Sequence, residues 1–247
     1  MMTKHGLIYF FNLGQHLRLV IQDLENLSDI LGRVQAERFY QPVDSSFRLK
    51  LLIGTQNLFH SNDKEHERAR KMLNPAFHFD NLQSMISIMI EHTQKTIDTC
   101  LEYSFVANIT NYLNKLTLSI IVSNTLGTDF GNHEIRDQAL TFILAGHETT
   151  SNLMSWITYE LVINSTVCHD CQDEVDRVLS YGLPLTYVQL NQPPIIEMVS
   201  QETLRLHLPA PFFARQCIKE QIIGKTSERL LRIPKGLTIL ANAYAIR

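Results

Sequence analysis

The chemistry that this chain could support starts from a short polar segment, Ala145 to Thr150, which interrupts a long apolar stretch. Glu148 and Thr149 place a carboxyl group beside a hydroxyl group, and these are the parts of a short proton relay. Gly146 has no side chain, so a flat ligand could approach the backbone closely there. A zinc-protease motif, H-E-x-x-H, is excluded because Ser151 stands where the second histidine is needed. The alternative interpretation is a kinked helix with satisfied polar groups, and the segment alone favours it.

A second candidate is the pair Glu202 and Arg205, whose spacing of three residues puts both side chains on one face of a helix. Apolar neighbours such as Met198 and Leu206 indicate that this face is buried. A buried arginine and carboxylate need near-ideal bidentate geometry to survive desolvation. By itself, however, the same spacing is common on solvated helices, and the pattern alone favours that alternative.

A third candidate lies on the charged segment 63–73, where His66 and Arg70 are four residues apart and share a helix face. Both side chains could donate hydrogen bonds to one ligand that carries a carboxylate. Arg68 and Lys71 add positive charge to the same segment. The alternative is an exposed, charged helix, and the segment alone favours it.

The composition limits the classes of protein that these patterns could belong to. The 247 residues are 45% hydrophobic and 19% charged, with a formal net charge of -3. These values are typical of a soluble protein with an apolar core and exclude a disordered chain. The lack of a basic excess argues against a nucleic-acid-binding groove. No stretch has the about 20 mostly apolar residues that a membrane-spanning helix needs.

The four cysteines, Cys100, Cys168, Cys171 and Cys217, are too few for a disulfide framework in a chain of this length. Cys168 and Cys171 form a C-x-x-C motif, but it has neither a second pair nor a histidine at zinc-finger spacing. A redox or zinc role is the less favoured alternative. Reduced thiols in an intracellular protein are the favoured interpretation.

The elements that must position the candidates are mostly helices. Apolar periodicity predicts helices at 24–38, 63–73, 80–103, 108–125, 134–163, 170–180 and 195–207. Asp23 is a suitable N-cap for the first of these helices. Strands are predicted within 7–21, around a turn at Gly14, and within 211–247, whereas 40–62 is predicted to be a loop.

The predicted helix 134–163 carries the first candidate site. It is apolar on nearly all sides at both ends, which is typical of a buried helix. We expect it to be continuous but distorted between Gly146 and Thr150, because Thr149 can compete for a backbone carbonyl and glycine lowers local stiffness. Gly127 and Gly131 mark a break before this helix.

Each pattern is weak alone, but their order resembles that of the cytochrome P450 family. AGHETT is similar to the family's oxygen-activating I-helix motif, [AG]-G-x-[DE]-T-[TS], and ETLR within QETLRLHLPAP resembles the E-x-x-R of its K helix. HERARKMLNPAFHF is similar to the C-helix region, where a tryptophan or histidine and an arginine bind the haem propionates. IPKGLTILANAYAI resembles the strands after the K helix, and FFNLGQHLRLVIQDLENLSDIL resembles the N-terminal sheet and B helix. The PAFHF segment resembles most the family-4-like or family-3-like animal enzymes.

The resemblance implies a mainly α fold with small β-sheets. It would form one partial domain over residues 1–247, with the N-terminal sheet and B to E helices in 1–131 and the I to K helices and following strands in 132–247. The implied activity is haem-thiolate monooxygenation of a lipophilic small molecule with O₂. The implied cofactor is haem b, with electrons from NADPH supplied by NADPH–cytochrome P450 reductase. The implied location is the cytosolic face of the endoplasmic reticulum membrane, and no nucleic acid is involved.

The resemblance also assigns roles to individual residues. Glu148 and Thr149 would deliver protons during oxygen activation. Glu202 and Arg205 would form a direct, mostly buried structural ion pair. The residues that would contact the haem or its propionates are His66, Arg70, Ala145, Gly146 and Arg215.

The sequence also departs from the family pattern. It passes from Gly131 to the I-helix motif with little between, where the family has its F and G helices. It contains no F-x-x-G-x-R-x-C-x-G loop, which supplies the cysteine ligand of the iron, and Cys217 in a strand-like stretch is not that cysteine. No metal ligand is therefore assigned. The alternative function is a truncated or mis-annotated non-catalytic fragment, and we expect the coding sequence around Gly131 and beyond Arg247 to hold the missing parts.

Overall fold

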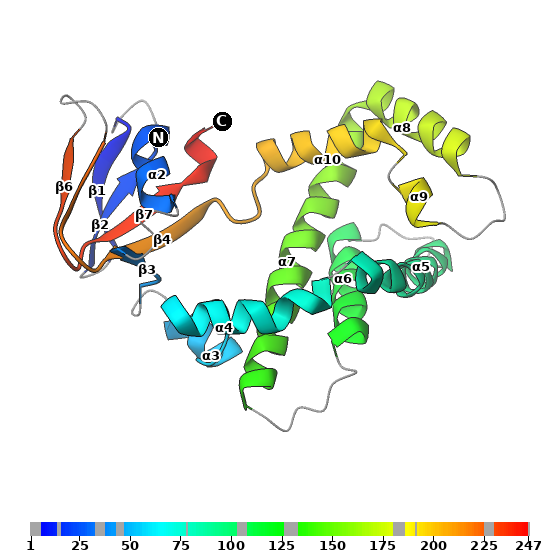
Figure 1. The fold of residues 1–247 in the computed structure, drawn as a ribbon. Coiled ribbons are helices and arrows are strands. Elements are labelled where there is room, and N and C mark those ends of the chain that lie inside the picture. The colour runs from blue at the N-terminus through cyan, green and yellow to red at the C-terminus, as the bar shows by residue number, and fades with distance from the viewer. Residues whose placement is uncertain are drawn as a thin grey trace. The chain divides into compact units, whose positions relative to one another are not determined.

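The computed structural model describes residues 6–13, 16–32, 38–42, 47–77, 79–102, 108–125, 133–179, 186–190, 192–224 and 230–246. The chain forms two compact units, residues 1–69 with 210–247 and residues 70–209. The predicted turn at Gly14 and the predicted break at Gly127 and Gly131 lie outside the described residues. The fold is mainly helical with small sheets, as predicted (Figure 1).

The first unit is built on a sheet of five strands in the order β1-β2-β7-β4-β3. Its strands are β1 (Ile8–Leu13), β2 (His16–Ile21), β3 (Phe39–Tyr40), β4 (Phe212–Cys217) and β7 (Thr238–Asn242). β1 and β2 form the predicted antiparallel pair, β2 runs parallel to β7, and β7 runs antiparallel to β4. A second sheet pairs β5 (Gln221–Ile223) with β6 (Leu231–Ile233). The strands predicted within 7–21 and 211–247 are confirmed.

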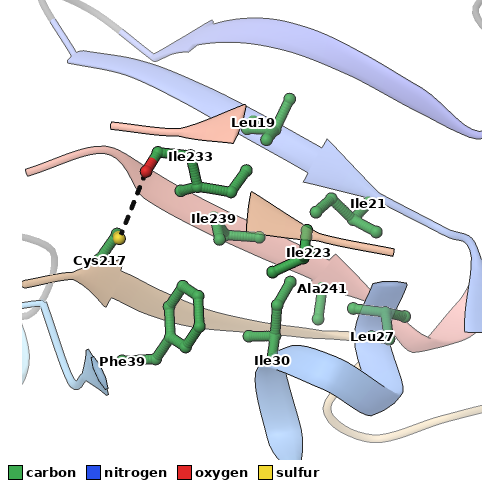
Figure 2. Packing of buried hydrophobic residues seen from close by; sticks show 10 residues of the cluster. All are labelled: Leu19, Ile21, Leu27, Ile30, Phe39, Cys217, Ile223, Ile233, Ile239 and Ala241. Atoms are coloured by element: carbon green, nitrogen blue, oxygen red, sulfur yellow. Dashed lines mark hydrogen bonds between the residues drawn. The ribbon is translucent and has the colours of Figure 1, made fainter. Parts of the chain in front are cut away.

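The core of this unit lies where the sheets meet α2 (Leu24–Leu31). Figure 2 shows its side chains, and they come from both ends of the chain: Leu19, Ile21, Leu27, Ile30, Phe39, Cys217, Ile223, Ile233, Ile239 and Ala241. In β7, Ile239 and Ala241 are two residues apart and therefore point to the same buried face.

Helix α2 begins as predicted and ends sooner. The Asp23 carboxylate accepts a hydrogen bond from the Asn26 backbone N–H at 3.0 Å, which is the expected N-cap. The helix ends at Leu31, and not at residue 38, because Gly32 takes an extended conformation with ψ of 144°. Residues 33–37 lie outside the described part of the chain.

One helix lies inside the segment 40–62, so the prediction of a loop throughout that segment is wrong. Helix α3 (Phe47–Ile53) has the sequence FRLKLLI, in which leucine, lysine and arginine are strong helix formers. Because polar residues flank this short apolar run, the sequence pattern around it is that of a loop. The buried amide of Asn57 holds the turn that follows, because Nδ2 donates to the Ile53 carbonyl at 3.0 Å and Oδ1 accepts from the His60 N–H at 3.0 Å. The chain then enters α4 (Asp63–Leu73), which matches the predicted helix.

The second unit is helical. After a short 3-10 turn at Asn74–Phe77, its helices are α5 (Phe79–Glu102), α6 (Ile109–Thr125), α7 (His133–Ile163), α8 (Ser165–Val178), α9 (Tyr187–Leu190) and α10 (Pro194–Leu206). The long helix α7 contacts α6, α8 and α10 (Figure 1). The predicted helices are confirmed, although α8 begins at Ser165 and not at residue 170.

Helix α7 is continuous, as predicted, and α-helical at every residue. The Thr149 hydroxyl donates to the Ala145 carbonyl at 2.6 Å, which is the predicted backbone contact. No 3-10 or π turn interrupts residues 145–150, so the predicted distortion is not seen as a change of helix type. A threonine can share a carbonyl with the helix ladder without breaking the ladder, which accounts for this outcome.

Helix α7 is not buried on all sides, contrary to the prediction. Ala139 and Ser151 are buried, whereas Trp156, Tyr159 and Val162 are exposed. Among the described residues, the helices that contact α7 cover only part of its circumference. The apolar residues of α7 are therefore divided between a packed face and an open face.

The carboxylate of Glu174 joins α8 to α10. Its side chain is 1% exposed. It accepts hydrogen bonds from the backbone N–H groups of Ile195 and Ile196 at 3.0 and 3.1 Å. These N–H groups lie in the first turn of α10, where they have no partner within the helix and the helix dipole favours a negative charge. Glu174 therefore fixes the start of the helix that carries Glu202 and Arg205.

We predict that Glu174→Ala lowers the free energy of unfolding by about 2 kcal/mol, because it leaves two N–H groups without an acceptor. The matched control is Asp173→Ala on the exposed side of α8, which should change stability by less than about 0.5 kcal/mol. Urea unfolding followed by circular dichroism measures both. Equal effects of the two substitutions would contradict the anchoring role.

Candidate functional site

A cavity of about 270 Å³ in the first unit brings together two residues that the sequence analysis assigned to the cofactor. His66 and Arg215 both line it, together with Tyr40, Asp63 and Glu67. These residues lie far apart in the sequence. They meet because β3 pairs with β4, so that Tyr40 lies opposite Gln216, the neighbour of Arg215.

Arg215 is a half-buried cation without an acidic partner. Its Nη1 donates to the Ala214 carbonyl at 2.9 Å, and among the described residues it forms no ion pair. Burial lowers the pKa of the guanidinium, because desolvation disfavours the charged form. An unpaired, partly desolvated arginine is suited to a ligand with a carboxylate, since the ligand would supply the missing charge.

The loop before α4 sets the position of His66. Asp63 starts α4 with a φ of 49°, a left-handed conformation that aspartate tolerates better than most residues. The Tyr40 hydroxyl donates to the Asp63 carboxylate, and the Gln41 N–H donates to Asn62 Oδ1 at 3.1 Å. These contacts hold the start of α4 against β3, and they place the half-buried His66 at the cavity.

Arg70 follows His66 by one turn of α4 and is exposed. The two side chains share a helix face by their spacing, as predicted. Arg70 is not among the residues that line the cavity, so its role toward a propionate stays a prediction.

The segment Ala145 to Thr150 divides its residues between two faces of α7. Ala145, Glu148 and Thr149 are exposed. Gly146 faces α6 instead: a methyl group in place of its hydrogen would lie 3.3 Å from Cδ1 of Ile121. The small residue therefore permits close packing of two helices, and the predicted contact of Gly146 with a flat ligand stays a prediction.

A row of polar contacts between α6 and α7 accounts for the polar residues of this segment. The Thr117 hydroxyl lies 2.9 Å from His147 Nδ1, and the buried Ser151 hydroxyl donates to Asn114 Oδ1. The sequence alone does not predict Thr117, Asn114 or Ser151 as partners. The only signal was the spacing of polar residues on α6, which does not identify a partner helix. These contacts set the rotation of α7 that leaves Glu148 and Thr149 on the open side.

The ion pair between Glu202 and Arg205 is confirmed, and its predicted burial is wrong. Arg205 donates to the two carboxylate oxygens of Glu202 at 2.8 and 2.6 Å, in bidentate geometry. Their side chains are 55% and 52% exposed. The hydrogen bond to Arg205 lowers the pKa of Glu202. Among the described residues, α10 turns Thr203 inward and presents this pair to solvent, so removing Glu202 would not strand a buried guanidinium.

We predict that the contact between Gly146 and Ile121 limits the stability of the α6–α7 packing. Gly146→Ala should gain up to about 1 kcal/mol of helix propensity, but its methyl group crowds Ile121. Ile121→Val removes the crowding carbon. Gly146→Ala should therefore stabilise the chain by about 0.5 kcal/mol more in the Ile121→Val background. A double-mutant cycle of urea unfolding measures this, and additive effects would contradict the contact.

Two kinds of feature are not found among the described residues. No group of three or more histidine, cysteine or acidic side chains is arranged to hold a metal ion there. No helix within the described ranges is both long enough and apolar enough to span a bilayer.

Comparison with known proteins gives one consistent result. The family model described as cytochrome P450 matches residues 1–134 and 127–247. Human cytochrome P450 4F8 is 30% identical over 156 residues, which are 62% of this chain and 29% of that protein. Bovine cytochrome P450 3A28 is 32% identical over 181 residues, or 70% of this chain and 34% of that protein.

The chain is also similar to part of a bifunctional bacterial protein. The bifunctional cytochrome P450/NADPH–P450 reductase 2 of Bacillus subtilis is 40% identical over 98 residues, which are 40% of this chain and 9% of that protein. The matched parts thus span about a third or less of each of these relatives. Because the two matches to the family model together cover residues 1–247, the chain belongs to the cytochrome P450 family.

Proposed function

We propose that this protein acts in haem-dependent monooxygenation of a lipophilic small molecule. The observation that carries the proposal is the cavity in which His66 and the unpaired Arg215 meet. Both side chains can donate hydrogen bonds, and Arg215 has no acidic partner among the described residues. This donor set fits the carboxylates of a haem propionate. A role for Arg70 toward a propionate is proposed from the family resemblance alone.

The bound haem would supply the oxygen chemistry, and the chain's own residues would supply protons and packing. The Thr149 hydroxyl donates a hydrogen bond to the Ala145 carbonyl, so its oxygen remains able to accept a hydrogen bond from another donor. Glu148 is exposed beside it and can exchange protons with water. For a relay, the Thr149 hydroxyl would turn from the Ala145 carbonyl, give its proton to the acceptor and take a proton from Glu148, which water protonates again. Ala145, exposed on the same side of α7, would leave room for a flat group.

The proposal extends to the source of electrons and to the location. The bacterial relative is named for a cytochrome P450 joined to an NADPH–P450 reductase. We propose that NADPH supplies electrons here through a separate reductase. A location on the cytosolic face of the endoplasmic reticulum membrane follows from the resemblance to microsomal family members.

We predict that haemin binds the 247-residue chain and that Arg215→Gln weakens its binding about tenfold, the loss of one charge-assisted hydrogen bond. Arg215→Lys keeps the charge and should have a smaller effect. The control is Arg232→Gln on the exposed edge strand β6, which should leave the Kd unchanged. A Soret-band titration measures the Kd. Equal affinities for the Arg215→Gln and Arg232→Gln variants would contradict the propionate site.

A second proposal concerns residues 1–247 taken alone, which contain no F-x-x-G-x-R-x-C-x-G loop. Cys217 ends β4 in the core, where it is fully buried and its Sγ donates to the Lys219 carbonyl at 3.0 Å. Burial raises the pKa of this thiol and keeps it protonated. We propose that these residues by themselves do not catalyse oxidation, because they lack the loop that carries the family's cysteine ligand and Cys217 is enclosed in the core.

We predict that the haemin complex of the 247-residue chain, reduced under CO, lacks the red-shifted Soret band of a thiolate-ligated iron. The absorption spectrum of the ferrous–CO complex checks this. Cys217→Ala should leave the spectrum unchanged. A thiolate-type band that disappears in Cys217→Ala would overturn the second proposal and make Cys217 the ligand.

A further inference from the structure

A second cavity, of about 570 Å³, lies within the helical unit between α7, α8 and α10. Its wall is mainly apolar, and the side chains come from all three helices: Ile157, Leu161, Val175, Ile196 and Val199. The proposed haem function uses none of these residues. A cavity of this size, lined in this way, can hold the hydrocarbon part of a small molecule.

Two thiols lie in the wall of this cavity. Cys168 and Cys171 are one turn apart on α8, and both are free. Cys171 is 7% exposed, and among the described residues its thiol makes no hydrogen bond. A buried polar group without a partner costs free energy, so a ligand with an acceptor oxygen would be favoured at this position.

The surroundings of the two thiols differ. Desolvation, with a further contribution from Glu174, raises the pKa of Cys171, so this residue stays a neutral thiol and a weak hydrogen-bond donor. Cys168 is half-buried and reaches both the cavity and the solvent. Because Cys168 reaches the solvent as well as the cavity, it is the member of the pair that an electrophile can approach.

We propose that this cavity binds lipophilic α,β-unsaturated aldehydes and that Cys168 adds to them covalently. The apolar wall takes the hydrocarbon tail, and the Cys171 thiol donates to the carbonyl oxygen. The Cys168 thiolate, formed by loss of a proton to water, attacks the β-carbon. A C–S bond forms, the π electrons of the C=C bond move to the α-carbon, and that carbon takes a proton from water. The product is a thioether, and no oxidant or reductant is needed.

The chain offers an internal reference for the test. Cys100 on α5 is also free and partly exposed, and it does not line this cavity. The reduced chain is treated with limiting acrolein or limiting nonenal, and the adducts at Cys168 and Cys100 are counted by peptide mass spectrometry. Acrolein has the same reactive group without the tail. We expect the ratio of Cys168 to Cys100 adducts to be about tenfold higher with nonenal.

Two pairs of measurements decide the outcome. Val199→Thr makes the cavity wall polar with almost no change of volume, and Val162→Thr makes the same change at an exposed position of α7. Val199→Thr should lower the preference for nonenal at Cys168 several-fold, and Val162→Thr should not. The same adduct ratio for both aldehydes, or a preference that survives Val199→Thr, would overturn the site. Cys171→Ala should slow nonenal addition at Cys168, and an unchanged rate would overturn the role of Cys171.

Discussion

The pairing of β7 with two partners is the constraint on which the first unit depends. Leu19 of β2 and Arg215 of β4 both lie opposite Ile239, although they are far apart in the chain. Closing such long loops costs entropy, and burial of the shared apolar cluster must offset that cost. Once β4 is held by β7, β3 can pair with β4. The cavity that joins His66 to Arg215 is therefore a consequence of strand pairing and needs no direct contact between the two residues.

In the helical unit, the polar contacts of α7 with α6 determine which face of α7 is packed and which is open. His147 and Ser151 hold α6, and Gly146 lets Ile121 approach. Rotation of α7 by one residue would break these contacts together. The segment from Ala145 to Thr150 and the neighbouring Ser151 thus have two functions. Some of these residues pack against α6, whereas Glu148 and Thr149 lie between them and remain open to a ligand.

The sequence was sufficient to predict most helices and strands and the family. It was insufficient to predict which faces of those elements are buried. Asp23 capped its helix, and the segment 63–73 formed its helix, because both depend on neighbouring residues. The short helix at 47–53 was missed because polar flanks masked a single apolar run. The spacing of Glu202 and Arg205 determined the ion pair. Its exposure depends on which other elements cover α10, and no local pattern reports that.

The cysteines show most clearly that the tertiary surroundings, and not the local sequence, determine the chemistry of a side chain. Cys217 is enclosed between strands and bonded to a carbonyl, so its thiol is inert. Cys171 is also buried, in the wall of a cavity, but its thiol has no hydrogen-bond partner within the described part of the chain, and Cys168 lies one turn away within reach of water. From the sequence, Cys168 and Cys171 form a C-x-x-C motif for which a redox or zinc role is the less favoured interpretation. The apolar cavity beside them, built from three helices, is what gives the pair a chemical use.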